Sequence, residues 1–178
     1  MKPTPALPGD YFAVFELEPK LGIDTEVLQQ RFYELSRQHH PDRFASKTSA
    51  EQQYALDYTA LLNDAYRVLR DAVARSEYML KKEGFDIGEQ RSNDVPPELL
   101  EEVFELNMML EAAPDRPELE AARDRFVGMR AETDEEIAAL FVDYDTAASR
   151  EILTRLRGVL NRRRYIQNLL RDVEKALA

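Results

Sequence analysis

The chain of 178 residues has no cysteine, only two histidines and only six glycines. The absence of cysteine excludes disulfides, thiolate catalysis and any cysteine-ligated zinc or iron–sulfur site on this protein. No run of alternating polar and apolar residues indicates a strand, and residues that favour helices (alanine, leucine, glutamate, arginine and glutamine) dominate instead. We therefore expect an all-α protein.

Long hydrophobic runs are absent as well. No segment is apolar enough to span a membrane, and residues 1–9 lack the apolar core of a signal peptide, so the cytoplasm is the expected compartment. The formal net charge of −10 argues against sequence-independent binding to nucleic acid, which requires a basic surface. No Gly-x-x-x-x-Gly-Lys loop for nucleotide is present, since Gly-Lys never occurs. We expect no cofactor, no metal ion and no active site of the protein's own.

The charges are distributed unevenly along the chain. The segment Asp94–Asp145 contains 16 acidic and 4 basic residues, whereas Arg150–Arg171 contains seven arginines and one acid. An acidic pair of helices that packs beside a basic helix would explain this pattern. A dedicated anion site is the alternative explanation.

Apolar periodicity and capping residues predict two groups of helices. In the first group, the first helix is expected over Tyr11–Leu17 behind the cap Asp10, and the second from Asp24 to Pro41 with Leu28, Phe32 and Leu35 on one face. The third is opened by the capping box Ser49–Gln52. The fourth covers Val73–Lys82 and ends at Gly84. The polar segment 86–96 follows and has no apolar periodicity. We therefore expect a first domain over residues 1–86 with a loose tail over 1–9, a linker over 87–95 and a second domain over 96–178.

Three helices are expected in the second domain. The first covers Pro97–Ala112, and the next carries apolar residues from Leu119 to Tyr144. The last has apolar residues at alternating spacings of four and three from Ile152 to Leu177, with Arg163 as one interruption. This spacing is typical of an antiparallel helical bundle.

Both histidines of the chain lie next to each other, in the segment His39–Asp42. A metal site is a poor explanation, because adjacent side chains diverge and no third histidine or cysteine exists. Acid–base catalysis by His40 and Asp42 would need a pocket and partners that the sequence does not show. A simple turn that stops the helix is the third interpretation.

The flanking sequence favours a more specific interpretation. The stretch Gln30–Ala45 resembles the second helix and signature loop of a J domain, and Asp10–Leu17 and Leu62–Tyr66 resemble its first and third helices. In J domains this loop and the exposed face of the preceding helix contact a DnaK-type chaperone and trigger its ATPase. The residues that the resemblance assigns to chaperone binding are His40, Pro41, Asp42, Arg31, Arg37 and Arg43.

The residues of the His39–Asp42 loop predict its local conformation. Pro41 fixes its own backbone and moves His40 off the helix end, so we expect the imidazole to point outward. We expect Asp42 to accept backbone N–H bonds that hold the turn. Gln29 and Tyr33 occupy positions where J domains often carry basic residues, which favours a dedicated chaperone over a general one.

The sequence that follows the J-domain motif indicates which J-domain family the chain resembles. No Gly/Phe-rich linker or cysteine-rich region follows, and Arg75–Leu80 and Gly84–Asp86 are similar to the J-domain end of the HscB family of iron–sulfur co-chaperones. The resemblance implies an L-shaped protein, a J domain joined to a three-helix client-binding domain. It also implies that the protein stimulates a DnaK/HscA-type chaperone and delivers an IscU-type scaffold protein to it. A J-domain adaptor for a different client is the alternative.

The helix expected over Pro97–Ala112 carries two apolar stripes. One stripe is the expected core face and consists of Leu99, Val103, Leu106 and Leu110. The second stripe, roughly 120° away around the helix, either faces the rest of the bundle or docks a partner. In the HscB family this helix docks the scaffold protein on which the cluster is built. The residues thereby assigned to scaffold binding are Leu100, Phe104 and Met108 of this stripe, the flanking Glu101 and Glu105, and Tyr165 on the last helix.

Overall fold

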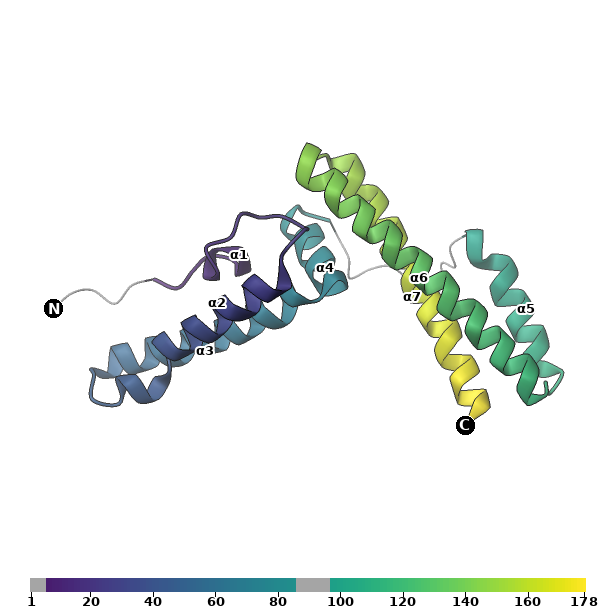
Figure 1. The fold of residues 1–178 in the computed structure, drawn as a ribbon, viewed down its shortest axis with the longest axis horizontal. Helices are drawn as coiled ribbons and strands as arrows, with labels where there is room; N and C mark the ends of the chain where they lie inside the picture. Colours follow the sequence, from purple (N-terminus) through teal and green to yellow (C-terminus); the bar gives the residue numbers. More distant parts are fainter. Residues whose placement is uncertain (1–5, 86–96) are drawn as a thin grey trace. The chain divides into compact units, whose positions relative to one another are not determined.

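Every regular element within the described residues, 6–85 and 97–178 of this computed structural model, is a helix. The prediction of an all-α fold is confirmed. The chain divides into two compact units, Met1–Glu83 and Gly84–Ala178, and Figure 1 shows the helices of each. The predicted linker over 87–95 and the start of the predicted tail lie outside the described part, and the L shape stays a prediction. None of the described helices is long and apolar enough to cross a membrane.

The first unit is built on capped helices. They are α1 (Tyr11–Val14), α2 (Thr25–Gln38), the 3-10 helix η1 (Pro41–Phe44), α3 (Ser49–Arg70) and α4 (Ala72–Lys82). Asp10 and Asp24 cap α1 and α2 as predicted, because each carboxylate accepts hydrogen bonds from backbone N–H groups of the first turn. Gly84 follows α4 with a φ of +76°, the left-handed conformation that ends helices.

Two predicted helix ends are wrong. α1 ends at Val14 rather than three residues later, because Glu16 adopts a φ of +54° and cannot continue a right-handed helix. α3 is capped by Thr48 rather than Ser49. The Thr48 hydroxyl accepts from the Glu51 N–H at 3.3 Å, and the Glu51 carboxylate accepts from the Thr48 N–H at 2.9 Å. The capping box therefore lies one residue earlier than predicted.

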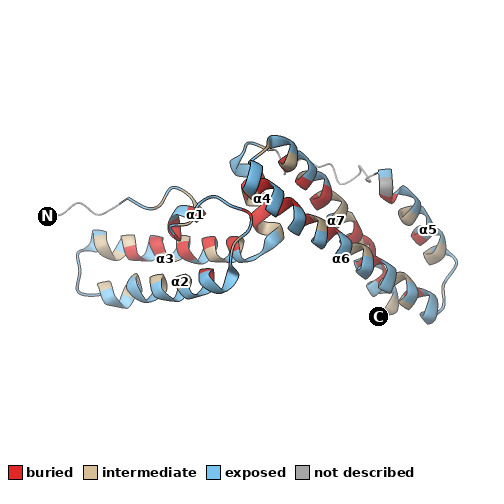
Figure 2. Ribbon diagram, turned by 45° about the horizontal axis from the view of Figure 1, so that its top comes forward, coloured by how far each residue is buried: buried red, intermediate tan, exposed pale blue. Residues whose placement is uncertain are grey.

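α2 and α3 run antiparallel and form the body of the first unit (Figure 1). The predicted apolar face of α2 points inward: Leu28 is buried, and Phe32 and Leu35 are half-buried. Phe32 stacks on Tyr66 of α3 with ring centroids 4.2 Å apart. Figure 2 shows buried positions recurring along α3, and the buried residues of this helix are Ala55, Tyr58, Leu62, Ala65 and Leu69.

The last helix of the first unit closes on the first helix. Lys82 of α4 donates to the Asp10 carboxylate at 2.7 Å, and this hydrogen bond is the main cause that lowers the pKa of Asp10. The Tyr78 hydroxyl accepts from the Tyr11 N–H at 3.0 Å, and the two rings stack with centroids 4.5 Å apart. The N-terminal cap of α1 is thus tied to α4.

The second unit contains the short 3-10 helix η2 (Pro97–Leu99), α5 (Leu100–Glu111), α6 (Arg116–Ala147) and α7 (Arg150–Leu177). The helix predicted from Pro97 therefore begins with a 3-10 turn. α6 and α7 form a long antiparallel pair, and α5 packs beside one end of it (Figure 1). The core shared by the three helices consists of Leu99, Leu106, Leu119, Phe126, Ile166, Leu169, Leu170 and Val173.

Charges link these helices, as the uneven sequence pattern suggested. Arg163, which interrupts the apolar spacing of α7, contacts Asp134 of α6 at 2.5 Å, and the adjacent Arg162 pairs with Glu136. These pairs support the explanation in which an acidic helix packs beside a basic one. Because ion pairs at the edge of a bundle are individually weak, we expect them to set the pairing of α6 and α7 more than its strength.

Candidate functional site

The His-Pro-Asp loop joins the end of α2 to η1. The His39 N–H donates to the Leu35 carbonyl at 2.9 Å and makes the last helical bond of α2. His40 then adopts extended backbone angles, φ −57° and ψ 129°, as expected of a residue before proline. Its side chain is 58% exposed and that of Asp42 is 91% exposed. Both therefore face solvent, as the sequence predicted for His40.

The group that holds the turn differs from the prediction. The Nδ1 atom of His40 accepts a hydrogen bond from the Asp42 N–H at 3.3 Å, so the imidazole caps the turn rather than the Asp42 carboxylate. A ring nitrogen that accepts carries no proton, which in the neutral imidazole leaves the proton on Nε2. The loop therefore presents a histidine N–H and a carboxylate side by side, held by Pro41 at the first position of η1.

The three predicted arginines occupy two kinds of position. Arg37 and Arg43 are exposed at the loop, where the Arg43 guanidinium donates to the Arg37 carbonyl at 3.4 Å. Arg31 lies about two turns earlier on α2, where it pairs with Glu16 and donates through Nε to the Phe15 carbonyl at 3.4 Å. The structure thus gathers Arg37 and Arg43 with the His-Pro-Asp loop and uses Arg31 to hold α2 against the segment after α1.

A contact with α3 supports the loop and was not foreseen. The His39 ring stacks on Tyr58 with centroids 3.9 Å apart and meets the edge of Tyr54 at 6.4 Å. Burial lowers the pKa of His39. Both tyrosines lie on α3, and no role at the loop was predicted for them from the sequence. Their spacing of four residues near the end of the loop was the available signal, because it places both rings on one helix face.

The two stripes of α5 have different surroundings. All four residues of the first stripe are buried in the core or packed against it, as predicted: Leu99, Val103, Leu106 and Leu110. The second stripe is exposed, with Leu100 at 55%, Phe104 at 65% and Met108 at 54%. It therefore does not face the bundle, and the interpretation of this stripe as core is wrong.

The other predicted scaffold-binding residues differ in accessibility. Glu101 and Glu105 are exposed beside the stripe, and the Glu105 carboxylate accepts from Arg125 of α6 at 2.8 Å. Arg125 also contacts Glu102 at 3.5 Å, so α5 is held to α6 by one guanidinium between two carboxylates. Tyr165 is half-buried against the core of the unit, and its buried hydroxyl has no hydrogen-bond partner among the described residues. Its side chain is therefore less accessible than those of the exposed stripe.

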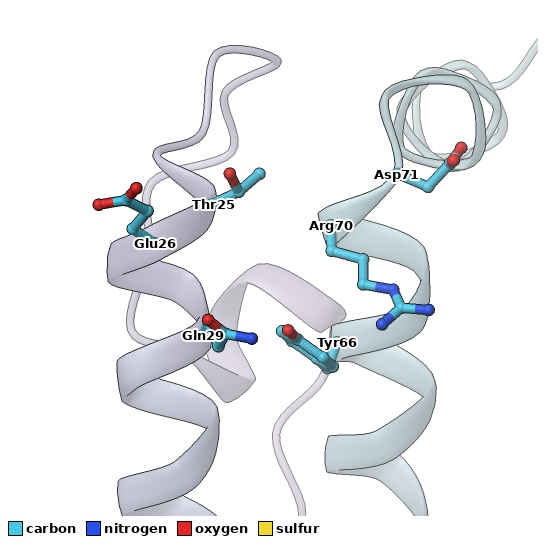
Figure 3. Close-up of a pocket in the computed structure, with 6 residues that line it drawn as sticks. All are labelled: Thr25, Glu26, Gln29, Tyr66, Arg70 and Asp71. Carbon is cyan, nitrogen blue, oxygen red and sulfur yellow. The ribbon is translucent and has the colours of Figure 1, made fainter.

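A hollow lies between the start of α2 and the end of α3 (Figure 3). Its lining residues are Thr25, Glu26, Gln29, Tyr66, Arg70 and Asp71. The Arg70 guanidinium lies over the Tyr66 ring, 5.4 Å from its centroid. Because α2 and α3 are antiparallel, this hollow is at the other end of the pair from the loop, and neither His40 nor Asp42 lines it.

Comparisons with known proteins match both units. The DnaJ domain family matches residues 10–78, and the HSCB C-terminal oligomerisation domain family matches residues 95–174. Proteins named co-chaperone protein HscB homolog from serogroup B and serogroup C strains of Neisseria meningitidis are 32% identical over 174 residues, which cover 95% of this chain and 99% of each relative. The chain belongs to the HscB family.

Solved HscB structures share the fold. The crystal structure of human co-chaperone protein HscB has a TM-score of 0.75 at 23% identity, over 96% of this chain and 83% of that one. The chaperone HscB from Vibrio cholerae has a TM-score of 0.67 at 26% identity, over 93% and 96%. The predicted family and co-chaperone function are confirmed, and the J domain of this HscB-family protein implies an Hsp70-type partner.

Proposed function

We propose that this HscB-family co-chaperone stimulates the ATPase of a dedicated HscA-type chaperone and delivers an IscU-type scaffold protein to it for iron–sulfur cluster assembly. The observation that carries the proposal is the exposed apolar stripe of α5, which supplies a client surface in a different unit from the His-Pro-Asp loop. A protein with one exposed recognition surface in each unit is suited to hold two partners at once.

The chaperone surface is the loop with the end of α2. His40 offers an N–H and Asp42 a carboxylate, and Arg37 and Arg43 add positive charge around them. Such a set favours a polar partner surface that carries carboxylates and a hydrogen-bond acceptor. The exposed Tyr33 and Gln29 on α2 add contacts without charge, which supports a dedicated chaperone rather than one selected by a dense basic helix.

The client surface is the stripe formed by Leu100, Phe104 and Met108. Three large apolar side chains, each more than half exposed, follow one side of α5 and have Glu101 and Glu105 at their border. An apolar centre with a polar rim is the usual composition of a protein interface. It fits a scaffold protein that offers an apolar patch bordered by basic residues.

The chain itself performs no chemistry in this proposal. Its contribution is to keep the client close to the chaperone while the loop triggers ATP hydrolysis there, and tethering of two sites raises the effective concentration of one partner near the other to about the millimolar range for short linkers. We propose the cytoplasm as the compartment of this activity.

Separated units test the coupling directly. A fragment of residues 1–86 should stimulate the chaperone weakly, a fragment of residues 92–178 should bind scaffold without stimulating, and a mixture of the two at micromolar concentration should not reproduce the scaffold-enhanced stimulation of the intact chain. Equal stimulation by the mixture and the intact chain would refute coupling. If the intact chain stimulates but captures another protein instead of a scaffold from a lysate of its source, the adaptor for a different client is correct.

A further inference from the structure

His39 occupies the position from which the loop departs. It is the residue at which α2 ends, with its N–H bonded to the Leu35 carbonyl at 2.9 Å, and the next residue, His40, already has extended backbone angles. A small rotation of the backbone at His39 would therefore displace the whole His-Pro-Asp segment. Whatever fixes His39 also fixes the direction in which His40 and Asp42 point.

The side chain of His39 is fixed by α3. Its ring stacks on Tyr58 at a centroid distance of 3.9 Å and an interplanar angle of 28°, and Tyr54 meets it edge-on. The Nδ1 atom is buried and has no hydrogen-bond partner among the described residues. The ring therefore serves as an aromatic face that packs on Tyr58, and Nδ1 adds no hydrogen bond to that contact.

The backbone around the loop is also bonded to α3, on both sides. The Thr59 hydroxyl has one proton, which it donates mainly to the Ala55 carbonyl at 2.7 Å, and the His39 carbonyl at 3.3 Å is its second, weaker acceptor at the end of α2. After the loop, the Gln52 amide donates to the Ala45 carbonyl at 3.0 Å and the Lys47 carbonyl at 3.1 Å. One helix thus holds the chain where it enters the loop and where it leaves.

We propose that His39 is a positioning residue for chaperone stimulation: its ring on Tyr58 and its carbonyl near Thr59 hold the His40–Asp42 segment in the orientation that the chaperone recognises. The ATPase measurement of this role rests on the proposed function, whereas the hydrogen-exchange measurement rests on the loop geometry alone. His39 does not need to touch the chaperone. Without the stack the loop is less constrained, so in a larger fraction of molecules the His40–Asp42 segment has an orientation that the chaperone does not recognise.

Three variants of the full chain separate positioning from stability. His39→Ala removes the ring, His39→Phe keeps an aromatic face, and Phe32→Ala is the matched control because it removes another stack between α2 and α3, seven residues before His39 and away from the loop. An aromatic pair contributes enough to change an equilibrium by roughly two- to tenfold. His39→Ala should therefore raise the concentration for half-maximal ATPase stimulation by about that factor, while His39→Phe and Phe32→Ala stay within about twofold of the parent chain, measured below their melting temperatures.

Amide hydrogen exchange supplies a readout without the chaperone. The N–H groups of Asp42 and Arg43 are bonded within the loop, to His40 Nδ1 and to the His40 carbonyl. Their exchange should be faster in His39→Ala and unchanged in His39→Phe and Phe32→Ala. If His39→Ala does not fold, Thr59→Val tests the carbonyl contact by the same exchange measurement and should also accelerate it.

The outcomes are distinct. If the parent chain does not stimulate the chaperone, the proposed function fails, and the exchange rates still decide the positioning role. Positioning is refuted if His39→Phe loses as much stimulation as His39→Ala, because the ring would then act through a nitrogen. It is also refuted if Phe32→Ala loses as much as His39→Ala, or if loop exchange is the same in all variants.

Discussion

Replacing Leu100 and Phe104 together with alanine should abolish tight scaffold binding and leave the second unit folded. Full burial of a leucine or phenylalanine side chain stabilises a fold by about 1.5–3 kcal/mol. Leu100 is 55% and Phe104 65% exposed, so less than half of that contribution, at most about 1.4 kcal/mol for each residue, is available to be lost. Aromatic and apolar anchors at interfaces cost about 2–4 kcal/mol when truncated, which corresponds to at least about a thirtyfold loss of affinity.

Calorimetric titration with the scaffold and thermal melting of the same sample measure the two effects. Leu106→Ala is the matched control, because Leu106 lies on the same helix but is only 4% exposed. It should cost about 2–5 kcal/mol of stability, as large-to-small changes in cores do. A melt of the double variant that collapses like the control would refute the assignment of the stripe as an interface. An intact melt with unchanged affinity would place the client site elsewhere, and Tyr165 would be tested next.

Three further predictions concern stability. The hydrogen bond from Lys82 lowers the pKa of Asp10 in the folded chain, so as pH falls the Asp10 carboxylate is protonated first in the unfolded chain. The stability that this bond contributes is therefore present above about pH 4 and is lost below that pH. Lys82→Met should lower the melting temperature at pH 7 and make it depend less on acid pH. Burial lowers the pKa of His39 below about 6.5, so the unfolded state binds more protons below that pH, and the melting temperature should fall from pH 7 to 5 more in the parent chain than in His39→Phe. Ala148 has a φ of +46°, which costs a non-glycine residue about 1–2 kcal/mol, so Ala148→Gly should raise the melting temperature, whereas the control Ala139→Gly in the middle of α6 should lower stability by about 1 kcal/mol.

Local sequence rules predicted the features that depend on neighbours in the chain. Asp24 and Pro41 bound α2 because a side-chain cap and a missing N–H act within one turn. The end of α1 could not be predicted in this way. Glu16 has a left-handed backbone and pairs with Arg31 of α2, a residue 15 positions away, so the helix end depends on a tertiary contact.

Periodicity predicted two stripes on α5 but not which of them faces water. A helix pattern shows which residues share a face, whereas burial depends on how many helices surround it. α5 packs on α6 and α7 from one side only, through Leu99 and Leu106, and this arrangement leaves Phe104 exposed. The capping of the His-Pro-Asp loop could not be predicted from local sequence for the same reason. Pro41 indicated an outward imidazole, but the choice of His40 over Asp42 as the cap depends on geometry in three dimensions.

The stimulation of a DnaK-type ATPase by the full chain and by its His40→Gln variant tests the central claim most directly. The His40 side chain is 58% exposed, and exposed substitutions usually change stability by less than about 0.5 kcal/mol, so the melting temperature should hardly change. We predict that the parent chain stimulates single-turnover ATP hydrolysis and that the variant does not. Unaltered stimulation by the variant, or a large loss of melting temperature, would contradict the assignment of the loop as the surface that the chaperone recognises.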